Sequence, residues 1–181
     1  MSRMLITRRS ALAGSLALVL GQQAKGEGRS TQSIDAVWQG IELSDVTGST
    51  FQIRDCRATL TLVKLWANWC PACLVEMQTL KSLVTAMGPR DIEVILVSHP
   101  EYWSRDQLVA RNQGFAFRLA TPAPNTALAT IQAAMTESNG AYAVPRSLLF
   151  RKGKEAAVWV HRGAREWTSP EVVTQLKSQI G

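Results

Sequence analysis

Two cysteines that are two residues apart lie where an apolar strand is expected to give way to a helix, and this pair constrains the chain most. Leu60 to Trp66 is rich in large apolar and β-branched residues, as in a buried strand. Pro71 suits the first position of a helix, and Ala72 to Met87 carries apolar residues at three- and four-residue spacing. The segment Trp69-Cys70-Pro71-Ala72-Cys73 is therefore predicted to join a strand to a helix.

This position gives the two cysteines a specific chemistry. Cys70 is expected at the helix N-cap, where unpaired N–H groups and the helix dipole stabilise a thiolate, the nucleophile of disulfide exchange. Cys73 lies one turn later on the same face, close enough to bond to Cys70. Cys70 is therefore predicted to attack a substrate disulfide and Cys73 to resolve the mixed disulfide. A structural disulfide and half a zinc site are the alternatives, but Cys56, His99 and His161 lack paired ligand spacing, so no metal is expected.

The first 24 residues have the plan of an export signal. Arg3, Arg8 and Arg9 precede the apolar run Ala11–Leu20, and a polar segment of small residues follows. The Arg8-Arg9 pair also resembles a twin-arginine signal. We expect an export signal over 1–24, a linker over 25–40, one domain over 41–181 and a periplasmic location, either soluble or anchored to the inner membrane by the signal.

Charge argues against nucleic acid as a partner. The formal net charge of +6 falls to about +3 once residues 1–24, which hold three arginines and no acid, are set aside. No run of basic residues with interleaved aromatic residues is left to contact a phosphate backbone.

The remaining periodicity predicts an α/β fold. Strands are expected at 50–53, 92–97, 147–150 and 156–160, helices at 103–112, 127–135 and 170–180, and a proline-rich loop at 119–125. The alternation of strands and helices asks for parallel crossovers in the first half, and the last two strands should pair antiparallel. The result is a mixed central sheet flanked by helices.

The segment from Leu62 to Cys73 resembles the active-site strand and loop of the thioredoxin superfamily, and Leu74–Met77 resembles its exported TlpA-like branch. The resemblance implies a thioredoxin-like three-layer sandwich and a protein thiol–disulfide oxidoreductase. No cofactor is implied, because electrons pass between sulfurs. The Val144-Pro145 dipeptide matches the family's cis-proline, which faces the dithiol and pairs with the substrate chain. Trp69 is expected to add an apolar lip beside Cys70.

The resemblance also favours a direction and partners. It implies a reductase of protein disulfides, for example in cytochrome c maturation or metallochaperone reduction, supplied by a membrane electron-donor protein. An oxidase or isomerase of exported proteins is an alternative. A Cu(I)-binding protein using Cys70, Cys73 and Met77 is another. We expect a monomer, because the short linker contains no dimerisation segment.

Two departures from the family pattern concern charged residues. Strand parity sends Lys64 to the same face as Leu62, where the family usually has Asp or Asn. A buried lysine needs a partner, and Glu76 is predicted to pair with it beneath the dithiol and tune proton transfer to Cys73, unless both side chains reach solvent. Arg146 follows Pro145, where Thr is common, and is expected either to act near the substrate site or to point into solvent.

Two further residues each allow two interpretations. Cys56 lies where the resemblance places a core leucine, so it is expected to behave as a small buried hydrophobe, with pairing to another chain as the alternative. His99 follows the strand 92–97 at its C-terminal end, and it is expected to be structural rather than part of the site.

Overall fold

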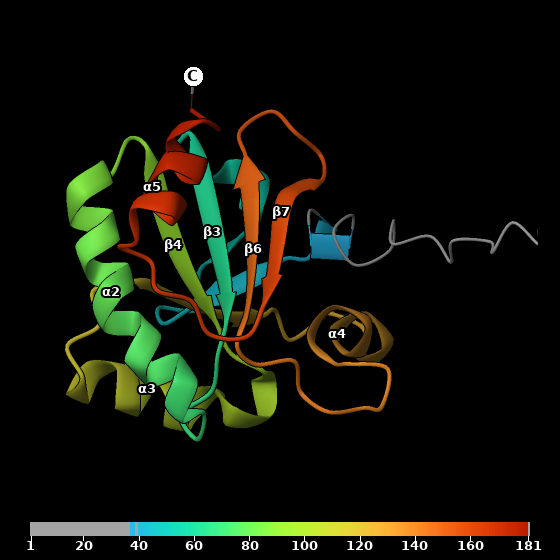
Figure 1. Cartoon of the computed structure of the whole chain (residues 1–181). Coiled ribbons are helices and arrows are strands. Elements are labelled where there is room, and N and C mark those ends of the chain that lie inside the picture. The colour runs from blue at the N-terminus through green and yellow to red at the C-terminus, as the bar shows by residue number, and fades with distance from the viewer. Residues whose placement is uncertain (1–36, 39, 181) are drawn as a thin grey trace, which may run out of the picture.

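The computed structural model describes residues 37–38 and 40–180, which form an α/β sandwich around one seven-stranded sheet (Figure 1). The expected export signal lies outside these residues, as does most of the expected linker. The strands are β1 (Leu43–Asp45), β2 (Thr50–Phe51), β3 (Leu60–Leu65), β4 (Ile92–Val97), β5 (Arg118–Pro122), β6 (Arg146–Arg151) and β7 (Ala157–Arg162). The helices are α2 (Pro71–Met87), α3 (Trp103–Asn112), α4 (Leu128–Met135) and α5 (Pro170–Lys177), with the 3-10 turns η1 (Ile53–Asp55) and η2 (Pro100–Tyr102). In the part that is described, no helix is long and apolar enough to cross a membrane.

The strand order is β2-β1-β5-β4-β3-β6-β7, with β3 near the centre. Strand β3 pairs parallel with β4 and antiparallel with β6, and β6 pairs antiparallel with β7. The predicted mixed sheet is thus confirmed. Parallel pairing brings the carboxyl ends of β3 and β4 to one edge, and the chain enters α2 from this edge (Figure 1).

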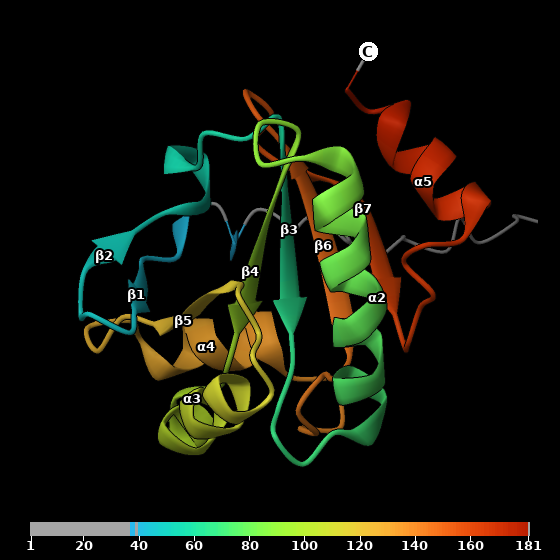
Figure 2. The same cartoon turned by 90° about the vertical axis from the view of Figure 1, so that its left-hand side faces the viewer.

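Alternation along β3 divides the core into two layers. Leu60 and Leu62 pack with α2 and α5, whereas Val63 and Leu65 pack with α4 on the opposite face. Figure 2 shows α2 and α5 on one side of the sheet and α4 on the other. Because strand side chains alternate, Lys64 points to the face covered by α2.

The predicted loop at 119–125 is wrong, because residues 118–122 form β5. The prolines in this segment favoured a loop, but β5 pairs with β4 only from Arg118 to Ala120. Pro122 therefore lies beyond the β4 ladder, where the missing N–H removes no bond to β4. Trp38, in the expected linker, has no exposed surface and packs in the α4-side core, so the packed domain begins before residue 41.

The two-layer core makes a stability prediction. Leu62→Ala removes a fully buried side chain from the central strand and should lower the free energy of unfolding by about 2–5 kcal/mol. Denaturant unfolding measures this change. Leu108→Ala in α3 is the control, because Leu108 is 60% exposed and should change stability by less than about 0.5 kcal/mol. Equal losses in the two variants would contradict the assigned core.

Candidate active site

The two cysteines of the Trp69–Cys73 segment form a disulfide at the start of α2. Their Cα atoms are 5.3 Å apart. Cys70 is 5% exposed and Cys73 is fully buried. Cys70 is therefore the more accessible of the two residues, as expected for an attacking cysteine.

Local backbone geometry favours a thiolate at Cys70. Cys70 is the N-cap of α2, and its sulfur accepts a hydrogen bond from the N–H of Cys73 at 3.2 Å. Pro71 occupies the first helical position, and the first turn of α2 has no acidic residue to oppose the helix dipole. Backbone groups at the start of α2 thus stabilise a negative charge on Cys70.

A buried ion pair lies one helical turn along α2 from Cys73. The ammonium of Lys64, on β3, is 2.7 Å from Oε2 of Glu76 and 2.8 Å from its Oε1. Lys64 has no exposed surface and Glu76 is 2% exposed, so neither side chain reaches solvent. The predicted contact between the two residues is present. Burial lowers the pKa of Lys64, and the charge of Glu76 opposes this effect.

The pair is held by groups from two further segments, β6 and the connection between β7 and α5. The Lys64 ammonium donates to the Ser147 hydroxyl on β6 at 3.0 Å. Oε1 of Glu76 accepts from the Arg165 backbone N–H at 2.8 Å and from the Trp167 indole N–H at 3.1 Å. The carboxylate is therefore oriented from several directions, and the C-terminal segment is tied to α2 beneath the dithiol.

The Val144–Pro145 peptide bond, just before β6, is cis in the structure. Val144 packs partly against both core layers. The Pro145 carbonyl accepts from the Gly163 N–H at 2.9 Å, which fixes this turn to the end of β7.

Arg146 occupies neither of its two expected positions. It is 1% exposed, so it does not point into solvent, and its contacts are with Glu137 and the Ala134 carbonyl in and after α4. The cause is strand parity: Ser147 faces Lys64, so the adjacent Arg146 side chain points to the other face of the sheet. The expectation of a direct substrate contact through Arg146 is corrected accordingly.

An aromatic cluster that the sequence analysis missed surrounds Trp69. Trp69 is 49% exposed, and its ring lies edge-on to Tyr102 and Tyr142, with ring centroids 5.7 and 6.2 Å away. The ring of His99 lies 6.0 Å from that of Tyr102 and 5.5 Å from that of Tyr142, and His99 caps η2 by accepting from the Glu101 N–H. Burial lowers the pKa of His99. Trp69 thus forms the exposed rim of an aromatic cluster that also contains His99.

A buried carboxylate supports the loop that leads to Cys70. Asp106 on α3 has no exposed surface, and its Oδ1 accepts from both the backbone and side-chain N–H of Asn68 at 2.7 Å. Burial raises the pKa of Asp106, which the Asn68 hydrogen bond opposes. The sequence contains one signal of this role. Asp106 lies three residues after Trp103 and four before Ala110, so it is on the same inward face of a helix that has few apolar residues.

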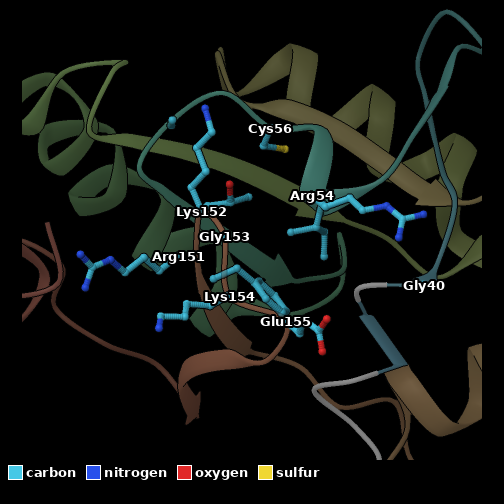
Figure 3. A pocket seen from close by; sticks show the side chains of 12 residues that line it. Gly40, Arg54, Cys56, Arg151, Lys152, Gly153, Lys154 and Glu155 are labelled. Carbon is cyan, nitrogen blue, oxygen red and sulfur yellow. The ribbon is translucent and has the colours of Figure 1, made fainter.

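A cavity of about 590 Å³ lies at the opposite end of the sheet from the dithiol, and none of its lining residues belongs to the site (Figure 3). Arg54 and the β6–β7 hairpin surround it, and the free Cys56 lies in its wall. Cys56 is 6% exposed, and burial raises the pKa of its thiol to about 11. It is therefore a buried thiol, as expected, and does not take part in the dithiol site.

Comparison with known proteins identifies relatives at two levels. The model of the AhpC/TSA family matches residues 35–150. A protein of undescribed function from Haemophilus influenzae is 29% identical over 62 residues, which are 34% of this chain and 39% of that protein. The chain thus matches about two fifths of the length of this curated relative.

Solved structures share the fold at low sequence identity. The thioredoxin domain of a thiol–disulfide oxidoreductase from Bacteroides vulgatus superposes with a TM-score of 0.58 at 11% identity, covering 78% of this chain and 93% of that one. A thiol:disulfide interchange protein of the thioredoxin family from Chlorobium tepidum superposes with a TM-score of 0.58 at 17% sequence identity. The match covers 77% of this chain and 92% of that one. StoA from Bacillus subtilis superposes with a TM-score of 0.54 at 16% sequence identity. The match covers 77% of this chain and 95% of that one. The expected thioredoxin-like fold is confirmed, and the family match agrees with the expected thioredoxin superfamily.

The buried pair predicts a change in thiol acidity. In the reduced protein, Lys64→Met removes the cation beneath the dithiol, and the pKa of the Cys73 thiol should rise by about one unit or more. Thiolate absorbance in the ultraviolet, followed against pH in a Cys70→Ser background, measures it. The double variant Lys64→Met/Glu76→Gln removes both charges and should return the pKa toward its original value. An unchanged thiol pKa in Lys64→Met would show that the pair does not tune the site.

The burial of Cys56 predicts slow thiol chemistry. In the oxidised protein Cys56 is the one free thiol, and at pH 8 it should react with an aromatic disulfide reagent about 100-fold more slowly when folded than when unfolded. Since its pKa rises from 9.0 to about 11 on folding, its contribution to stability is complete below pH 9 and is lost as pH rises toward 11. Comparable rates in the two states would contradict this burial.

Proposed function

The chain belongs to the AhpC/TSA family, and we propose that it is an exported thiol–disulfide oxidoreductase that reduces disulfides in other proteins. The observation that carries this proposal is the Cys70–Cys73 pair at the N-terminus of α2, with its more accessible cysteine at the helix cap and its second cysteine fully buried. No metal or organic cofactor takes part in the proposed chemistry.

The reaction begins with the reduced dithiol. The Cys70 thiolate attacks one sulfur of a substrate disulfide, a Cys70–substrate bond forms, and the substrate's second sulfur leaves as a thiolate that takes up a proton. The Cys73 thiolate then attacks the Cys70 sulfur and releases the first substrate sulfur, which is also protonated. Two electrons have passed to the substrate, and the enzyme is left with the Cys70–Cys73 disulfide. An external dithiol reduces this disulfide by the reverse exchange.

Cys73 must lose its proton inside a water-poor site before it can resolve the mixed disulfide. Glu76 lies one turn from Cys73 on the same buried face of α2, and Lys64 holds this carboxylate as an ion pair. We assign to the pair the control of that proton: the cation favours the thiolate, and the carboxylate is an oriented acceptor one helical turn away. The role is one of proton transfer and pKa tuning, since neither side chain reaches the surface.

Substrate binding is assigned to the rim around the dithiol. Trp69 offers an exposed apolar surface beside Cys70, and the Val144–Pro145 turn presents backbone to an extended substrate chain. Tyr142 connects the two, because its ring contacts Trp69 and it precedes Val144 by two residues. Arg146 is not part of this surface.

Location and partners follow from the proposed export. The signal-like residues 1–24 direct the chain to the periplasm, where an oxidising environment makes a dedicated electron source necessary. We propose a membrane protein with a reactive dithiol as this donor, and exported proteins with oxidised cysteines as the substrates, with the chain acting as a monomer.

The reduction potential of the Cys70–Cys73 pair tests the proposed direction. Equilibration of the purified protein with glutathione mixtures, followed by thiol trapping, gives the potential. A value near or below about −250 mV is expected for a reductase. A value of about −120 to −180 mV would mean that the protein oxidises or isomerises its substrates instead. Cys56→Ala serves as a control and should leave the potential unchanged, because Cys56 lies outside the site.

A further inference from the structure

A second ion pair, between a buried arginine and a partly exposed glutamate, lies on the face of the sheet that is turned away from the dithiol. The guanidinium of Arg146, at the start of β6, pairs through Nη2 with Oε1 of Glu137. Its Nη1 donates to the Ala134 carbonyl at 3.5 Å, and its Nε has no hydrogen-bond partner among the described residues. Arg146 is 1% exposed, so its charge depends chiefly on Glu137.

Glu137 belongs to the segment between α4 and β6, residues 136–145, which we name the proline loop. This loop is closed by the bridge between Thr136 and Tyr142 and by a hydrogen bond from the Glu137 N–H to the Ala141 carbonyl at 2.8 Å. Arg146 follows the loop directly. The Glu137–Arg146 pair therefore ties the beginning of the proline loop to the residue at its end.

The far side of the proline loop reaches the dithiol region. The Tyr142 hydroxyl donates to the Trp66 carbonyl at 3.2 Å, and its ring contacts Trp69. The same loop ends in the Val144–Pro145 turn. A displacement of the loop would therefore move both the aromatic rim and the backbone assigned to substrate binding.

We propose that Glu137 and Arg146 are positioning residues that hold the proline loop in the geometry needed to bind a protein substrate. The inference rests on the proposed function, and it concerns the substrate-binding surface rather than the dithiol. Neither residue belongs to the hydrogen-bonded group of Lys64, Ser147 and Glu76, so the chemistry of the thiols should not depend on them.

The chain supplies a matched control for this pair. Arg162 on β7 binds the other oxygen of Glu137, Oε2, at 2.8 Å, but its side chain is 63% exposed. Loss of an exposed arginine leaves water to solvate the carboxylate, whereas loss of Glu137 leaves the Arg146 cation buried without its partner. Arg162→Gln thus removes one ion pair from the same carboxylate without releasing the loop.

The test compares a protein substrate with a small disulfide. Insulin serves as the protein probe, with dithiothreitol as the reductant, and an aromatic disulfide reagent serves as the small probe. Glu137→Gln should raise KM for insulin about tenfold while kcat and the rate with the small disulfide stay within about twofold, because only binding is lost. Arg162→Gln should leave all three values within about twofold.

A double variant separates positioning from a simple loss of stability. Arg146→Met/Glu137→Gln removes both charges and should recover the thermal stability that Glu137→Gln loses, since no buried charge is left unpaired. The loop is still untied, so KM for insulin should remain raised. Return of KM to the original value with the return of stability would overturn the proposal, as would an unchanged KM in Glu137→Gln or an equal rise in Arg162→Gln.

Failure of the proposed function gives a different result. A wild-type protein that reduces neither insulin nor the small disulfide would refute the reductase, whatever the variants do. If the wild-type protein reduces both insulin and the small disulfide, but Glu137→Gln and Arg162→Gln have the same KM for insulin, only the role of Glu137 and Arg146 is refuted.

Discussion

The burial of the Lys64 ammonium in the middle of the central strand is the constraint on which the rest of the structure depends. An isolated ion at this depth would cost several kcal/mol, so the fold must bring a carboxylate to it. Glu76 does so from α2, and this contact fixes the rotation of α2 against the sheet. The same carboxylate then orders the C-terminal segment through Arg165 and Trp167. One charge on β3 thereby organises β6, α2 and the approach to α5 around it.

Stability alone does not account for this pair. Two apolar side chains of similar volume would fill the same space and would often be as stable or more so, because the attraction between buried charges barely repays their lost hydration. What an apolar pair would not provide is an oriented carboxylate and a cation one helical turn from a buried thiol. The position of the pair beside Cys73, rather than its strength, is the reason to regard it as part of the chemistry.

Sequence could predict this part of the site because local periodicities determine it. Strand parity gives the direction of Lys64, and helix spacing places Glu76 below Cys73. The surroundings of Arg146 were not predictable in the same way, because they depend on the course of the loop after α4, where no periodicity applies. The prediction for residues 118–122 was wrong for another reason. The prolines indicated a loop, but these residues form a strand because they pair with β1 and, over a shorter length, with β4. The role of Asp106 could not be predicted in full, because it depends on which loop packs against α3.

Strand β6 connects the Lys64–Glu76 pair and the Glu137–Arg146 pair through consecutive residues. Ser147 contacts Lys64 on the dithiol face, and Arg146 contacts Glu137 on the opposite face. Because successive side chains of a strand point to opposite faces, the two charged groups share a backbone but have no side-chain contact with each other. Thiol acidity and loop position can therefore change independently in this chain. An arginine after the proline places the ion pair that ties the proline loop on the face opposite to the dithiol, apart from the hydrogen-bonded group of Lys64, Ser147 and Glu76.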